Sequence, residues 1–344
     1  MHTSAASTAT KLVNLAFALA LVVVFLGAWT RINDAGLGCP DWPTCYGEFV
    51  MPVQQAGVDS QAHMAGADVL KAWLEMIHRY AAGVLGLLVL VLMVMAWRHR
   101  AQRVWPVRTT FLLGALILLQ AAFGMWTVTL KLVPWIVTLH LIGGLTILTL
   151  LYFLRAQLKH PRERQESLAR RVNVDLRVMP LLVVLAFQLV LGGWTSTNYA
   201  GAACSHWFFC HANGIGEFDF ANGLNPAMPH GPNYEGGLLE PEARAAIQVT
   251  HRFGALAVVL LLIMTSVRMR AESSRRVDLL LCWALCLTQI ALGMLNVVMF
   301  VPVHLAFLHH VTAVLLWLAV LRMALPRTQR QPYRELYHGN KITA

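Results

Sequence analysis

Long apolar runs separated by short polar segments dominate the pattern of this chain. One run extends from Trp73 to Ala96, which is long enough to cross a bilayer as an α-helix. The first run leads into a motif that recurs later in the chain, so we interpret it as a retained span and not as a cleaved signal. The pattern predicts eight membrane-spanning helices, over residues 12–29, 73–96, 109–129, 135–154, 179–197, 245–267, 278–299 and 304–325.

An internal repeat divides these spans into two sets of four. Residues 27–45 match residues 192–210 at an offset of 165, and residues 120–125 match residues 289–294 at an offset of 169. Four spans return the chain to its starting side, so the two sets are expected to run parallel. The expected fold is therefore an all-α membrane protein with two pseudo-symmetric four-helix bundles. Its expected parts are an N-terminal half (1–155), a cytoplasmic linker (156–178) and a C-terminal half (179–344).

Four histidines recur at matching depths, each about one turn inside the external boundary of its span. His78 matches His251 near the outer end of the second span of each half, and His140 matches His309 in the fourth span. Imidazole is a common axial ligand of heme iron, and helical bundles build such sites from facing helices. The pattern favours one bis-histidine heme per half over four histidines that only bond between helices. The repeat register favours His309 as the ligand, with the adjacent His310 as the alternative.

The two halves differ beside the first histidine of each pair. Glu75 lies one helical turn before His78, whereas Gln248 stands at the same place before His251. A carboxylate beside a heme can accept a proton or stabilise a developing positive charge, and an amide can do neither. We therefore expect the N-terminal half to be catalytic, with Glu75 as its acid. The alternative is an ordinary ion pair of Glu75 with Arg79 or Lys71 at the end of the helix.

Two cysteine pairs lie in the long segments 30–72 and 198–244. Cys39 and Cys45 share the first segment, and Cys204 and Cys210 share the second, so a disulfide is expected within each pair. A structural and a redox role for these disulfides both remain open. Outside these segments, we expect Cys282 and Cys286 to be free packing residues, and we expect His206 and His211 to be solvated.

Composition and charge support a membrane protein and fix its expected orientation. The chain has 344 residues, 57% of them hydrophobic and 13% charged. Its net charge of +10 does not indicate nucleic-acid binding, because 21 of the 27 basic residues fall on one side of the predicted spans. This distribution predicts cytoplasmic termini, with segments 30–72 and 198–244 outside a bacterial inner membrane.

The chain resembles the heme A synthase family over most of its length. The resemblance rests on residues 36–45, Glu75 with His78 and Arg79, residues 124–131 including Trp126 and Lys131, residues 138–140, residues 251–253, and residues 308–309. It implies an eight-helix enzyme that oxidises the C8 methyl of heme O to a formyl group through an alcohol.

What the resemblance implies for individual residues agrees with the repeat. It implies that Glu75, His78 and His140 surround the substrate heme O, and that His251 and His309 hold a b-type heme. It also implies heme O synthase and cytochrome oxidase assembly factors as candidate partners, and it leaves a homo-oligomer open. Two other classes remain as alternatives. A diheme electron-transfer protein does not explain why only one half carries an acid. A heme transporter or chaperone predicts no oxidised heme product and tolerance of Glu75→Gln.

Overall fold

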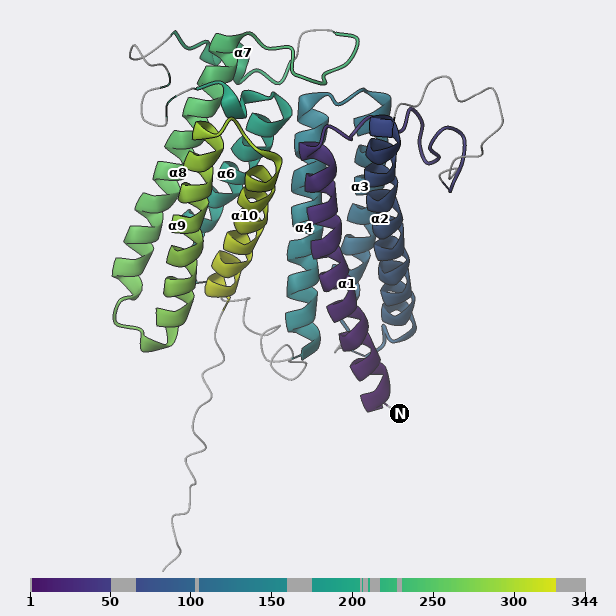
Figure 1. Ribbon diagram of the computed structural model, residues 1–344. Helices are drawn as coiled ribbons and strands as arrows, with labels where there is room; N and C mark the ends of the chain where they lie inside the picture. Colours follow the sequence, from purple (N-terminus) through teal and green to yellow (C-terminus); the bar gives the residue numbers. More distant parts are fainter. Residues whose placement is uncertain are drawn as a thin grey trace, which may run out of the picture.

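The protein is helical throughout the part that the structure describes. The computed structural model describes residues 2–50, 66–102, 105–159, 175–204, 206, 210, 217–227 and 231–325. Eight helices in these ranges are long and apolar enough to cross a membrane, and the described chain contains no β-strand (Figure 1). The predicted all-α membrane fold with eight spans is therefore confirmed.

The eight long helices form two groups of four. The N-terminal group comprises α1 (His2–Ile32), α2 (Gly66–Arg98), α3 (Val107–Thr129) and α4 (Pro134–Lys159). The C-terminal group comprises α6 (Met179–Thr197), α8 (Pro241–Met269), α9 (Arg276–Val298) and α10 (Val303–Ala324). The short elements are η2 (Ala200–Ala202), α7 (Phe220–Gly223) and η3 (Ser273–Arg275).

The structure modifies the predicted boundaries only at helix ends. Helix α4 continues through Lys159 and so includes the first residues of the predicted linker 156–178. Residues 160–174 of that linker lie outside the described residues. Helices α2 and α8 begin earlier than predicted, at Gly66 and Pro241, because polar residues at a span's end can still be helical.

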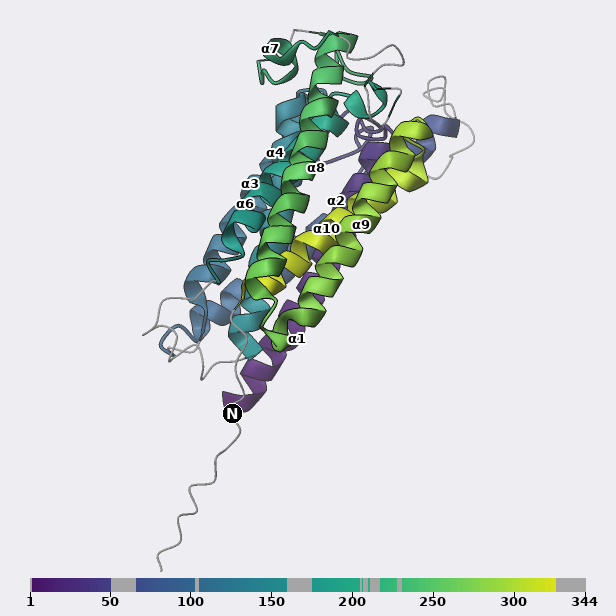
Figure 2. The ribbon, with the colours of Figure 1, turned by 90° about the vertical axis from the view of Figure 1, so that its left-hand side faces the viewer.

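The same neighbour relations occur inside both groups. Helix α1 contacts α2 and α4, and α3 contacts α2 and α4. In the C-terminal group α6 contacts α8 and α10, and α9 contacts α8 and α10 (Figures 1 and 2). The groups meet along two pairs of helices, α1 with α10 and α4 with α6.

Each group encloses its own apolar core. Val13, Leu85, Leu113 and Leu148 lie at the centre of the N-terminal core, and each comes from a different helix. Leu185, Leu262, Cys286 and Val320 occupy the corresponding place in the C-terminal core. Because the interior of a bilayer offers no hydrogen-bond partners, the backbone N–H and C=O groups pair within each helix. The side chains make the packing contacts between helices.

Polar contacts join the two groups at the end of the molecule that carries the long loops. Arg31 lies in the last turn of α1 and donates to Asp34 (3.0 Å), to the Tyr199 hydroxyl (3.2 Å) and to the Ser196 carbonyl (2.6 Å). Tyr199 in turn donates to Asp34 (2.7 Å), and burial is the main cause that raises the pKa of its phenol. Asp34 and Tyr199 are equivalent positions of the repeat, and both have a left-handed backbone, with φ of 49° and 53°.

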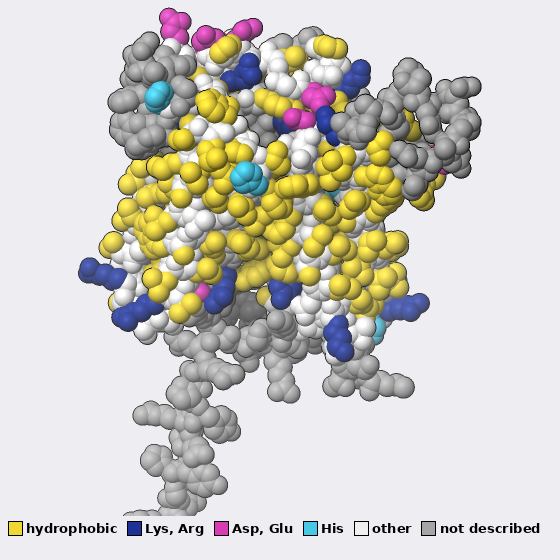
Figure 3. All heavy atoms as spheres, in the orientation of Figure 1, with side chains coloured by type: hydrophobic (Ala, Val, Ile, Leu, Met, Phe, Trp, Pro, Cys, Tyr) yellow, Lys and Arg dark blue, Asp and Glu magenta, His cyan; other side chains and the backbone are white. Residues whose placement is uncertain are grey.

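The surface has the layered character of a membrane protein. A broad hydrophobic band crosses the face of the molecule shown in Figure 3, and most of the visible Lys and Arg side chains lie at the edge opposite the loops. The visible acidic side chains lie mainly on the loop side. The orientation of the chain in a membrane stays a prediction from this distribution of charge.

Candidate functional site

Each of the four predicted histidines packs against a glycine of the neighbouring helix. His78 of α2 lies against Gly27 of α1, so that a Cβ on this glycine would be 2.9 Å from the imidazole Cε1. At the other three contacts, between His140 and Gly124, His251 and Gly192, and His309 and Gly293, the same distance is 3.3, 3.3 and 3.2 Å. A larger residue at any of these glycines would displace the ring. Because glycine has no side chain, each imidazole has room between its own helix and the neighbouring helix.

His78 and His140 face each other inside the N-terminal group. Their ring centroids are 6.4 Å apart, and the ring planes are nearly perpendicular, at 81°. Two imidazoles that ligate one metal ion from opposite sides through bonds of about 2 Å have ring centroids roughly 6 Å apart. The Nδ1 atoms of both rings are buried without a hydrogen-bond partner among the described residues. The separation of the two rings is therefore compatible with one heme iron held between them.

The C-terminal group holds His251 in place with a residue that the sequence analysis missed. The amide of Gln188 on α6 lies 3.1 Å from His251 Nδ1, and it also donates to the His251 carbonyl at 2.9 Å. Such a contact fixes the orientation and tautomer of a ligating imidazole. Val23 stands at the repeat-equivalent position of α1, so no side-chain amide reaches His78 from that position. The available signal was a single amide within the apolar run of α6.

His309 occupies the position that the repeat predicts. It packs on Gly293 as His140 packs on Gly124, and both contacts obey the offset of 169. The neighbouring His310 has a buried Nε2 without a hydrogen-bond partner among the described residues. The choice of His309 over His310 as the ligand stays a prediction.

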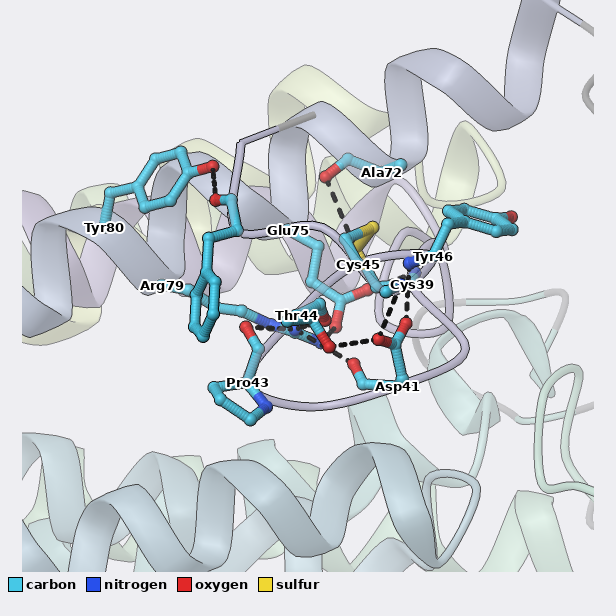
Figure 4. Close-up of a disulfide and its surroundings, with 12 residues drawn as sticks. Cys39, Asp41, Pro43, Thr44, Cys45, Tyr46, Ala72, Glu75, Arg79 and Tyr80 are labelled. Carbon is cyan, nitrogen blue, oxygen red and sulfur yellow. Dashed lines mark hydrogen bonds and ion pairs between the residues drawn. A yellow bond between two sulfur atoms is a disulfide. The ribbon is translucent and has the colours of Figure 1, made fainter. Parts of the chain in front are cut away.

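Glu75 holds the first cysteine loop against α2. Its side chain is 5% exposed, and it accepts a hydrogen bond from the backbone N–H of Cys39 at 2.9 Å. Its other oxygen pairs with Arg79 one turn further along the helix. The predicted pairing with Arg79 is thus present, but it is buried beneath the loop and not at a wet surface (Figure 4).

Gln248 makes the same loop contact in the C-terminal group. Its side-chain oxygen accepts from the backbone N–H of Cys204 at 2.7 Å, and its amide donates to the Gly201 carbonyl at 2.7 Å. Glu75 and Gln248 therefore make the same contact with the first cysteine of their loops. Their second partners differ, since Glu75 pairs with Arg79 and Gln248 donates to the Gly201 carbonyl.

A disulfide and an arginine shape the first loop. The structure contains the predicted bond between Cys39 and Cys45, and Arg79 donates to the carbonyl oxygens of Asp41 (3.0 Å) and Thr44 (2.7 Å) (Figure 4). Partial burial raises the pKa of the Asp41 carboxyl, but hydrogen bonds from Thr44, Gly47 and Tyr46 together lower it by more. The pKa therefore lies below its usual value. The loop is thus closed over Glu75 by both covalent and polar contacts.

The second loop follows the same plan with fewer contacts. Cys204 is bonded to Cys210, as predicted, and Arg252 donates to the His206 carbonyl at 2.9 Å. His211 lies outside the described residues. Cys282 and Cys286 are free and buried, in agreement with their predicted packing role.

The described residues contain no cluster of three or more His, Cys, Asp and Glu side chains that could hold a metal ion. A heme does not need such a cluster, because the porphyrin supplies four ligands and the protein supplies only the axial ones.

Trp126 and Lys131 also distinguish the two halves, since Leu295 and Phe300 stand at the equivalent positions of the repeat. Both residues lie near the loop end of α3. Trp126 is 36% exposed, and the carbonyl of Lys131 accepts from the Tyr234 N–H at 3.0 Å.

The fold and site define a polytopic helical membrane protein with paired histidines inside its helix groups. Residues 10–321 match the family described as cytochrome oxidase assembly protein. The heme A synthase of Shewanella oneidensis is 38% identical over 315 residues, covering 91% of this chain and 94% of that protein. The heme A synthases of Maricaulis maris and Rhizobium rhizogenes are each 26% identical and cover 89% and 86% of this chain, or 92% and 83% of their own. The chain belongs to the heme A synthase family.

If the C-terminal group holds a heme, we expect His309→Ala to remove its six-coordinate, low-spin signal, because the change deletes the predicted axial ligand. His310→Ala is the matched control and should leave that signal in place. Optical and electron paramagnetic resonance spectra of the purified variants measure both. Loss of the signal in His310→Ala alone would show that the ligand register is wrong.

Replacing a glycine that packs against one of the four histidines should displace the ring of that histidine. Gly192→Leu and Gly293→Leu should each lower the heme content of the C-terminal group several-fold, since a side chain would occupy the space of the ring. Gly144→Ala is the control, because a Cβ there has only ordinary contacts at 3.7 Å. Heme per protein, measured by the pyridine hemochrome assay, tests this; equal heme content in all three variants would contradict it.

Peptide mapping without reduction should recover Cys39 joined to Cys45 and Cys204 joined to Cys210. If the first pair is redox-active, Cys39→Ser lowers turnover and leaves heme content unchanged, whereas a purely structural pair would show parallel loss of both. Free thiols at all four positions, or bridges between the two loops, would rule out the assigned pairing.

Proposed function

We propose that this protein is a heme A synthase, which oxidises the C8 methyl of heme O to a formyl group and so supplies heme A for cytochrome oxidase. The carrying observation is the pair of facing imidazoles in the N-terminal group, whose 6.4 Å separation fits one heme iron between them. Family membership supports the reaction, because the relatives described above are heme A synthases.

The difference between Glu75 and Gln248 supports different tasks for the two groups. Both side chains accept the backbone N–H of the first loop cysteine, so neither is needed in a charged form to hold its loop. A carboxylate at only one of two equivalent places is therefore better explained by chemistry than by folding. We assign the N-terminal group, within residues 1–155, to the substrate heme O, and the C-terminal group, within residues 179–344, to a heme b cofactor.

The reaction needs a group that manages charge and protons next to the substrate. Conversion of methyl to alcohol and of alcohol to formyl each removes two electrons, and protons are released as the carbon is oxidised. Glu75 is buried, and its carboxylate is oriented by Cys39 and Arg79, so it can accept a proton or stabilise positive charge on the carbon without reorganising. When bound between His251 and His309, heme b supplies one-electron redox chemistry.

The cellular setting follows from the eight spans and the charge distribution. The protein is an integral membrane protein. We place both termini in the cytoplasm and both cysteine loops outside a bacterial inner membrane, in line with the basic residues at the opposite edge. Heme O synthase and cytochrome oxidase assembly factors are the proposed partners that would deliver heme O and receive heme A.

The two alternative functions predict different behaviour. A diheme electron-transfer protein would cycle its hemes without changing them, and a heme transporter would tolerate the loss of the Glu75 charge. The relatives support neither alternative. Mass analysis of hemes extracted from the purified protein separates all three, because only the synthase contains the alcohol or heme A.

Glu75→Gln should lower heme A formation by about 10²–10³, the effect expected when one well-placed electrostatic group is lost. The fold should persist, because Gln248 shows that an amide oxygen can accept the loop N–H at this place. Heme O or the alcohol should accumulate, and the heme signal of the C-terminal group should remain. Heme extraction and mass analysis measure this outcome.

Gln248→Glu in the same background is the matched control. It restores a carboxylate in the other group and should not restore heme A, because that group holds the cofactor. A Glu75→Gln variant with normal heme A output would overturn the catalytic assignment, and rescue by Gln248→Glu would overturn the division of tasks between the groups.

A further inference from the structure

The first cysteine loop carries two adjacent apolar side chains that the rest of the protein leaves uncovered. Phe49 is 68% exposed and Val50 is 73% exposed, and both follow the disulfide between Cys39 and Cys45. Contact of such side chains with water is unfavourable, so an exposed apolar pair on a loop indicates contact with a further apolar surface. The position of the loop against α2 determines which surface that is.

A tight turn sends the chain back towards α2 just before this pair. Cys45 and Glu48 exchange two backbone hydrogen bonds, at 2.9 and 3.2 Å. Between them, Tyr46 and Gly47 both have left-handed backbones, with φ of 55° and 80°. Turns with two left-handed central residues reverse the chain within four residues, so the residues that follow return to the helix.

The Tyr80 hydroxyl holds the end of the loop on the outside of α2. It donates to the Phe49 carbonyl at 2.6 Å, and a dashed line marks this bond in Figure 4. The same side of α2 carries the exposed residues Ile77, Val84 and Leu87. Figure 1 shows the loop beside this helix, on the side away from the C-terminal group. The loop end therefore lies on the lipid-facing surface of α2 and not inside the helix group.

The charge pattern of α2 gives the depth of this contact. The stretch from Tyr80 to Trp97 has 18 residues without a charged side chain, and Arg79 and Arg98 flank it. As a helix this stretch is about 27 Å long, which is close to the thickness of the hydrocarbon layer of a bilayer. Tyr80 therefore stands at the boundary of that layer on the loop side, the level at which tyrosines are enriched in membrane proteins.

We propose that Phe49 and Val50 insert into the bilayer at this boundary, and that Tyr80 holds them there. Contact with acyl chains removes their exposed surface from water. Glu48 precedes the pair, and a carboxylate is costly at the centre of a bilayer but can still reach water at its boundary. The partner of this loop surface is thus the lipid bilayer itself.

The C-terminal group has no tyrosine at the equivalent position. Phe253 corresponds to Tyr80 when His251 is aligned on His78, and it has no hydroxyl to donate. Its side chain is 67% exposed on the spanning helix α8. The lipid contact is therefore expected for the first loop, where it adds to the bonds that close this loop over Glu75.

Fluorine labels test the depth of the loop in the full-length protein. In separate samples, 4-trifluoromethylphenylalanine replaces Phe49 or one of two reference phenylalanines, Phe253 on α8 and Phe220 on α7 of the second loop. The protein is placed in lipid nanodiscs, and its fluorine NMR signal is recorded with dissolved oxygen, which concentrates among acyl chains, and with a water-soluble gadolinium chelate. We expect oxygen to be the main cause of broadening at positions 49 and 253, and gadolinium to be the main cause at position 220.

Tyr80→Phe copies the C-terminal group and removes only the hydroxyl. Loss of one hydrogen bond should lower the ratio of inserted to released loop by about two- to tenfold, so the label at position 49 becomes more sensitive to gadolinium. The label at position 253 should not change, and it reports that the variant is folded. An unchanged label at position 49 would overturn the role of Tyr80.

The wild-type labels give the two results that would overturn the insertion. A label at position 49 that behaves like the label at position 220 would place the loop in water. A label at position 49 that is shielded from both agents would show that protein and not lipid covers this surface. Neither result depends on a bound heme, so both leave the proposed synthase function to its own test.

Discussion

The contact between a histidine ring and a glycine backbone is the constraint on which the rest of the structure depends. An imidazole inside a membrane bundle needs space between helices that pack closely, and Gly27, Gly124, Gly192 and Gly293 provide that space. The glycines fix which helices pair and at what height. The depth of the histidines and the orientation of their rings therefore follow from helix packing. The loops need only close the site from outside.

The loops are coupled to the site through α2 and α8. Glu75 and Arg79 bind the first loop, and Gln248 and Arg252 bind the second, so each disulfide loop is fastened to the helix that also carries a histidine. The same position of the repeat can therefore hold an amide that orients the loop in one group and a carboxylate available for chemistry in the other, with no change of fold. The cost of burying the carboxylate is offset by its ion pair with Arg79.

Hydropathy and the internal repeat were sufficient to predict the eight spans, the paired histidines and the two disulfides, because each leaves a periodic or local signal. The burial of Glu75 under the first loop could not be predicted, since it depends on a contact with Cys39 that lies 36 residues away. The role of Gln188 required knowing that α6 faces His251.

The hydrogen bond between Asp34 and Tyr199 has a consequence for the history of the chain. The contacts of α1 with α10 and of α4 with α6 are equivalent under the repeat, which is the pattern of an isologous dimer joined into one polypeptide. In such a dimer of identical subunits, a position that meets its own counterpart would pair an acid with an acid or a phenol with a phenol. The unlike pair seen here requires the two positions to differ, which two copies within one chain allow.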